Sequence, residues 1–157
     1  ALANGPDLLI ADEPTTALDV TVQADILDLL GRLQAERRMT MILITHDLGV
    51  AAGRADEIAV MYAGRLVEKA STQAVFRRPR MPYTAALLRS IPRLDDPPHA
   101  PLYAIPGRPP VVFGDTAGCR YAPRCERADA RCTMSTPPMT VDAQGHGYRC
   151  WHPLEDS

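Results

Sequence analysis

The sequence predicts an α/β fold in its first half and an irregular, cysteine-containing tail after it. Two apolar runs, at residues 8–11 and 41–44, are short and uninterrupted, as buried parallel strands usually are. Between them, residues 20–38 place apolar side chains at helical spacing with polar residues in between. We therefore expect a strand, a helix and a second strand joined as a right-handed parallel crossover.

The elements after this unit are predicted from shorter patterns. In chain order they are a helix at residues 48–54, strands at 57–62 and 65–68, and helices at 72–77 and 83–90. Between the two strands, Ala63-Gly64 favours a hairpin turn. Asp19 precedes the long helix, where its carboxylate can accept hydrogen bonds from the first free backbone amides.

Composition limits the function and the domain organisation of the 157 residues. The net charge of −2 indicates no general affinity for nucleic acid, and no apolar run approaches the ~20 residues that a membrane-spanning helix needs. The chain becomes rich in proline at Pro92, Pro97, Pro98, Pro101, Pro106, Pro109 and Pro110. Such a run favours a stiff, irregular connection, so we expect a boundary between residues 1–91 and 92–157.

Acidic and imidazole side chains follow the two predicted parallel strands. Asp12 and Glu13 come directly after the first strand, and His46 follows the second. Ligands in open α/β sheets bind at the carboxyl ends of strands, so we expect these three residues along one edge of a site. Neighbouring residues on a strand point in opposite directions, which indicates different roles for Asp12 and Glu13. The alternatives are a plain acidic turn and a core histidine.

This arrangement resembles the ATPase subunits of ABC transporters. The apolar run ending in Asp12 looks like their Walker B motif, Thr16-Ala17-Leu18-Asp19 like their D-loop, and His46 like their switch histidine. The resemblance implies part of a P-loop NTPase sheet in which Asp12 holds Mg²⁺ through water and Glu13, matching the catalytic glutamate, orients the attacking water. It also implies that His46 bonds the γ-phosphate of ATP and that Asp19 acts across the interface with a second ATPase subunit.

Two motifs of that family do not occur in the printed residues. The phosphate loop G-x-x-x-x-G-K-[ST] is absent, and so is the family's signature motif. The resemblance implies that both precede Ala1, so that the chain is a fragment that starts in mid-domain. We therefore expect the isolated chain to bind ATP weakly and to be inactive.

All four cysteines lie beyond the expected boundary, at Cys119, Cys125, Cys132 and Cys150. An ATPase that uses cytosolic ATP works in a reducing compartment, where clustered cysteines ligate metal more often than they form disulfides. The spacing lacks the close C-x-x-C pairs of most zinc sites. An iron–sulfur cluster, a zinc site in which His146 or His152 replaces a cysteine, and metal-free thiols all remain open.

The second half also resembles a narrower family. Residues 82–88, Ile105-Pro106-Gly107 and residues 118–125 are similar to the C-terminal region of oligopeptide and dipeptide importer ATPases, although Met81 stands where that family usually has His. The resemblance implies a 4Fe–4S cluster on the four cysteines, with ATP and Mg²⁺ as the other cofactors.

That resemblance also implies partners and a location. These are a second ATPase subunit, transmembrane permease subunits and, indirectly, an external peptide-binding protein, at the cytoplasmic face of the cell membrane. A related nickel or glutathione importer is an alternative. So is a non-catalytic interaction module stabilised by metal.

Overall fold

The computed structural model describes residues 1–92, 97, 101–111, 114 and 116–155. Part of the predicted proline-rich connection, including Pro98, lies outside these residues. The chain divides into two compact units, Ala1–Ala55 and Asp56–Ser157. The boundary expected between residues 91 and 92 does not coincide with this division. It stays a prediction.

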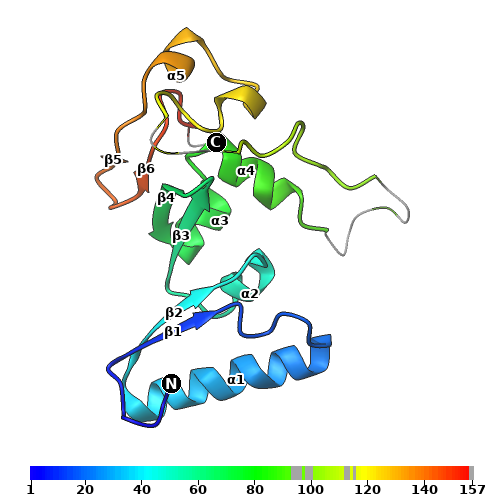
Figure 1. Ribbon diagram of the computed structural model, residues 1–157, viewed down its shortest axis with the longest axis vertical. Coiled ribbons are helices and arrows are strands. Elements are labelled where there is room, and N and C mark those ends of the chain that lie inside the picture. Colours follow the sequence, from blue (N-terminus) through cyan, green and yellow to red (C-terminus); the bar gives the residue numbers. More distant parts are fainter. Residues whose placement is uncertain (93–96, 98–100, 112–113, 115, 156–157) are drawn as a thin grey trace. The chain divides into compact units, whose positions relative to one another are not determined.

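The first unit is the predicted strand–helix–strand arrangement (Figure 1). Strand β1 (Leu8–Asp12) pairs in parallel with β2 (Thr40–Ile44), in a register that sets Leu8 opposite Thr40 and Asp12 opposite Ile44. Helix α1 (Val20–Arg37) connects them, and α2 (Leu48–Ala52) follows β2. The predicted α/β class and the parallel pairing are thus confirmed.

Local chemistry explains where the long helix begins and ends. The carboxylate of Asp19 accepts from the Val22 N–H at 3.0 Å, so it caps the first turn as predicted. Arg38 ends the helix in a left-handed conformation with φ of 55°. The core of this unit is small, and its buried apolar side chains are Leu9, Ala11, Leu27 and Met39.

The second unit begins with a hairpin of β3 (Glu57–Tyr62) and β4 (Arg65–Ser71), followed by α3 (Thr72–Arg77) and α4 (Pro82–Arg89). All four elements were predicted, and β4 extends three residues further than expected. Proline is favoured at the first position of a helix because its missing N–H is not needed there, and Pro82 begins α4.

The tail contains regular elements that the sequence did not predict. They are the 3₁₀ turn η1 (Ala122–Arg124), helix α5 (Ala130–Met134), and strands β5 (Thr140–Val141) and β6 (Gly147–Tyr148). Strand β6 pairs with β4, which gives a sheet of order β3-β4-β6-β5. The expectation of a wholly irregular tail is therefore corrected, because its last segment extends the sheet of the preceding hairpin. Among the helices that the structure describes, none is both long and apolar enough to cross a membrane.

Candidate functional site

The carboxyl ends of β1 and β2 bring Glu13 and His46 into contact. The Nδ1 atom of His46 lies 3.0 Å from Oε1 of Glu13, and the Thr16 hydroxyl donates to Oε2 at 2.8 Å. The contact follows from the parallel register, because strands that run in step end at the same edge of the sheet. Both side chains stay open to solvent, with 44% of Glu13 and 78% of His46 exposed.

The backbone of Glu13 is held in an unusual conformation. Its φ of 45° lies in the left-handed region, which residues other than glycine seldom adopt. Two hydrogen bonds hold it there: the Glu13 N–H donates to the Ile44 carbonyl at 2.9 Å, and the Thr16 N–H donates to the Glu13 carbonyl at 3.1 Å. Strain of this kind persists only where neighbouring groups enforce it, and it gathers at sites that do chemistry.

The hydrogen bonds also favour the ionised form of Glu13. The contact with His46, and next the one with Thr16, lowers the pKa of Glu13 from its usual 4.5, so the carboxylate is ionised near neutral pH. An ionised carboxylate only accepts hydrogen bonds, so Nδ1 of His46 must carry the hydrogen. In the neutral ring Nε2 then has no hydrogen, and it can only accept.

The two other predicted residues of this edge are Asp12 and Asp19. Asp12 is the last residue of β1, opposite Ile44, and it is exposed. The Asp19 carboxylate is exposed as well, and it serves as the cap of α1. No hydrogen bond in the described residues joins either of them to Glu13 or His46.

The four cysteines of the tail converge on one small cavity of about 10 Å³ in the second unit. Cys119, Cys125, Cys132 and Cys150 all line it, and none of them forms a disulfide. A cavity of this size holds about one water-sized group. Among the described residues, no three of these four thiols form a group whose ligand atoms all lie within 4.8 Å of one another, so a single ion would be held by all four only if they moved closer together.

Burial favours the protonated form of three of these thiols. Burial raises the pKa of Cys125 and of Cys132, and burial together with the three other thiols raises the pKa of Cys150 to about 11. Metals bind thiolates, so a metal that binds here must displace the thiol protons. The positive charge of the metal would then stabilise the thiolates, which the apolar surroundings do not. The donor set therefore fits a thiophilic metal centre.

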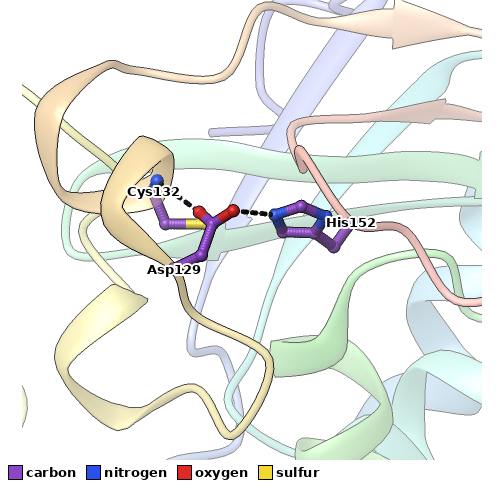
Figure 2. Close-up of side chains that lie close together, drawn as sticks. All are labelled: Asp129, Cys132 and His152. Carbon is purple, nitrogen blue, oxygen red and sulfur yellow. Dashed lines mark hydrogen bonds and ion pairs between the residues drawn. The ribbon is translucent and has the colours of Figure 1, made fainter.

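One further group gathers atoms that can bind a metal. Figure 2 shows the Asp129 carboxylate between Cys132 and His152, and potential ligand atoms of these three residues lie within 4.8 Å of one another. His152 also lines the cysteine cavity. Asp129 was not predicted as a site residue from the sequence. Its position three residues before Cys132 is the signal that could have identified it.

His146 is engaged elsewhere. Its Nε2 lies 2.6 Å from Oε1 of Glu68, and both side chains are almost fully buried. The Glu68 carboxylate also accepts from the N–H groups of Arg80 at 2.6 Å and of Met81 at 3.1 Å. His146 does not line the cysteine cavity, so of the two histidines considered for a zinc site the structure places only His152 there.

Comparisons with known proteins agree with the narrower resemblance. Residues 67–132 match the family described as "Oligopeptide/dipeptide transporter, C-terminal region". A putative peptide import ATP-binding protein of Brucella ovis is 50% identical over 96% of this chain and 46% of its own length. The dipeptide transport ATP-binding protein DppD of Escherichia coli is 46% identical over 100% of this chain and 48% of its own.

A solved structure also matches in part: cbiO1 from Clostridium perfringens, part of the ABC transporter complex cbiONQ, has a TM-score of 0.43 and 36% identity over 46% of this chain and 29% of its own. The chain spans about half the length of the curated relatives named above. In sequence, it corresponds to the C-terminal part of the ATP-binding subunits of oligopeptide and dipeptide importers.

Proposed function

We propose that this chain supplies the hydrolytic edge of an ATP-hydrolysing subunit that energises peptide import. The observation that carries the proposal is the contact of the exposed Glu13 and His46 at the ends of two parallel strands. The similarity to peptide import ATP-binding proteins supports the substrate class. A nickel or glutathione importer is the alternative within the same chemistry. A non-catalytic module stabilised by metal is the alternative outside it.

In this proposal Glu13 polarises the attacking water. Its lowered pKa keeps it ionised, and a general base must lie within hydrogen-bond reach of the water that it activates. Asp12 would hold Mg²⁺ through water, because Mg²⁺ keeps much of its hydration shell in sites of this kind. Asp19 would act across the interface with a second ATPase subunit, while its carboxylate caps α1.

His46 would bond the γ-phosphate, and its hydrogen-bond partner constrains how. While Nδ1 donates to Glu13, a neutral ring has no hydrogen at Nε2 to offer a phosphate oxygen. His46 must therefore either release Glu13 or bind a second proton when the phosphate arrives. Release would free the Glu13 carboxylate for water at the moment when nucleotide is bound.

The test of this role is Glu13→Gln in the full-length subunit with its partners. Losing a general base costs ~100-fold or more, so we expect ATP binding to persist while hydrolysis slows at least ~100-fold. Glu36→Gln is the matched control, since Glu36 is an exposed glutamate of α1 in the same unit. Turnover of the Glu13→Gln protein close to that of the control would remove Glu13 from the role.

We also propose a metal centre on Cys119, Cys125, Cys132 and Cys150, with a 4Fe–4S cluster as the first candidate. Four thiols around one cavity support it, and such a cluster is held by four cysteine thiolates. Zinc is the second candidate, favoured by the group of Asp129, Cys132 and His152, whose potential ligand atoms lie within 4.8 Å of one another.

Metal analysis separates the two candidates. Full-length protein purified without oxygen should be brown, with about four irons per chain. Cys125→Ser should lose the colour and the protease resistance of the tail. Colourless protein with one zinc per chain would instead establish the second candidate.

The remaining parts of the proposal concern the assembly. The ATPase subunit would work as a dimer with a second ATPase subunit, bind transmembrane permease subunits at the cytoplasmic face of the membrane, and meet the external peptide-binding protein only indirectly. The similarity to peptide import ATP-binding proteins supports this arrangement.

A further inference from the structure

Two side chains other than cysteine join the segments that carry the third and the fourth cysteine. The Asp129 carboxylate accepts from the Cys132 N–H at 3.0 Å through Oδ1, and its Oδ2 lies 2.8 Å from Nε2 of His152 (Figure 2). Asp129 precedes Cys132 by three residues, and His152 follows Cys150 by two. One carboxylate therefore holds a helix start on one side and the last cysteine segment on the other.

The fourth cysteine needs such a contact more than the first three do. Cys119, Cys125 and Cys132 are close in sequence, and the Cys119 N–H donates to the Cys132 carbonyl at 2.7 Å. Cys150 arrives only after the hairpin of β5 and β6. Closing the long connection between Cys132 and Cys150 costs chain entropy, which the pairing of β6 with β4 and the contacts between the two cysteine segments offset together.

Neighbouring contacts support the same junction. The Arg131 guanidinium lies over the Trp151 ring at 3.6 Å, and Nε1 of Trp151 donates to the Ser135 carbonyl at 3.0 Å. Through these contacts, the ring of Trp151 packs the Cys150 segment against α5 and the residue that follows it. Trp151 lines the cavity wall beside Cys132 and His152, so these contacts and the Asp129–His152 contact act on the same wall.

We infer that Asp129 and His152 form a latch that positions the Cys132 and Cys150 thiols for a metal bound by the four cysteines. This inference rests on the proposed metal centre. With the four thiols as ligands, Asp129 and His152 are positioning residues: the carboxylate oxygens face the Cys132 N–H and Nε2 of His152. Groups that orient ligands in this way affect metal affinity by about 10- to 100-fold.

The latch can be tested with Cd²⁺, which binds thiolates whether the natural metal is iron or zinc. We expect the full-length protein to bind one Cd²⁺ with an absorption band of four thiolates. His152→Ala and Asp129→Ala should keep that band and weaken Cd²⁺ binding about 10- to 100-fold. Asp129→Asn should restore most of the affinity, because an amide oxygen still accepts from the Cys132 N–H and the amide nitrogen can face His152.

Asp47→Ala is the matched control. Asp47 caps α2, a helix of five residues like α5, and its Oδ1 accepts from the Gly49 N–H at 2.8 Å, far from any cysteine in sequence. We expect wild-type Cd²⁺ affinity for this variant. Circular dichroism confirms that each variant is folded before its affinity is compared.

The outcomes separate the latch from the metal centre. Wild-type affinity in both His152→Ala and Asp129→Ala would overturn the latch and leave the centre standing. A nitrogen ligand in the ¹¹³Cd spectrum that vanishes in His152→Ala would make His152 a ligand, which also overturns the positioning role. A wild-type protein that binds no Cd²⁺ would overturn the four-cysteine centre itself.

Discussion

The described part of the chain contains two glutamate–histidine pairs that share their chemistry and differ in their exposure to solvent. In the first unit, Glu13 and His46 meet at 3.0 Å with 44% and 78% of their side chains exposed. In the second unit, Glu68 and His146 meet at 2.6 Å with 0% and 5% exposed. Both pairs join residues far apart in sequence, so local structure alone produces neither.

Solvent exposure decides what each pair can contribute. An ion pair in water adds little to stability, and Glu13 also occupies a strained backbone conformation, so this pair is poorly explained as a stabilising feature. A buried carboxylate is costly to desolvate unless it is fully hydrogen-bonded. Glu68 meets that condition with His146 and with the backbone amides of Arg80 and Met81. The exposed pair is available to substrate, and the buried pair joins β4, the tail and the start of α4.

The largest effect is expected from breaking the buried pair. Glu68→Ala leaves His146 and two backbone amides buried without their acceptor, so it should lower the free energy of unfolding by about 3–5 kcal/mol. Chemical denaturation measures this loss. Glu57→Ala is the control, because Glu57 is an exposed glutamate of β3 paired with Lys69 at 3.2 Å, and it should cost less than about 1 kcal/mol. Equal losses in the two variants would contradict the structural role of Glu68.

A smaller effect is expected at the exposed pair when pH changes. The folded-state pKa of Glu13 lies below 4.5, so its contacts stabilise the protein fully above pH 4.5 and are lost as pH falls through the folded pKa. His46→Ala should raise the Glu13 pKa towards 4.5, and Thr16→Ala should raise it less. Carboxyl NMR titration measures both shifts. A Glu13 pKa that is the same in His46→Ala as in the wild type would show that the contact does not form in solution.

Most of the fold could be predicted, because its elements are marked locally. The strands around Leu9 and Ile42 are apolar runs of strand length, and the carboxylate of Asp19 marks the start of α1. Strands β5 and β6 have two residues each, which is too short for an alternating pattern to appear. Their place in the sheet depends on β4, more than 65 residues earlier, and no local pattern encodes such a pairing.

Of the two glutamate–histidine contacts, one could be predicted from the sequence and the other could not. The contact of Glu13 with His46 could be predicted, because parallel strands end at one edge of their sheet. The burial of Glu68 could not, although its strand was predicted. Glu68 lies opposite buried Val60 across the antiparallel ladder, so the two side chains share the core face. The partner that makes this burial tolerable, His146, is 78 residues away.

In the proposed ATPase subunit, the exposed pair serves chemistry and the buried pair serves stability. ATP turnover per folded molecule in full-length Glu13→Gln and Glu68→Gln, compared at one temperature, tests this claim most directly. We predict that Glu13→Gln loses at least ~100-fold in turnover, whereas folded Glu68→Gln retains turnover within about threefold of the wild type. Equal losses in the two variants, or a larger loss in Glu68→Gln, would contradict it.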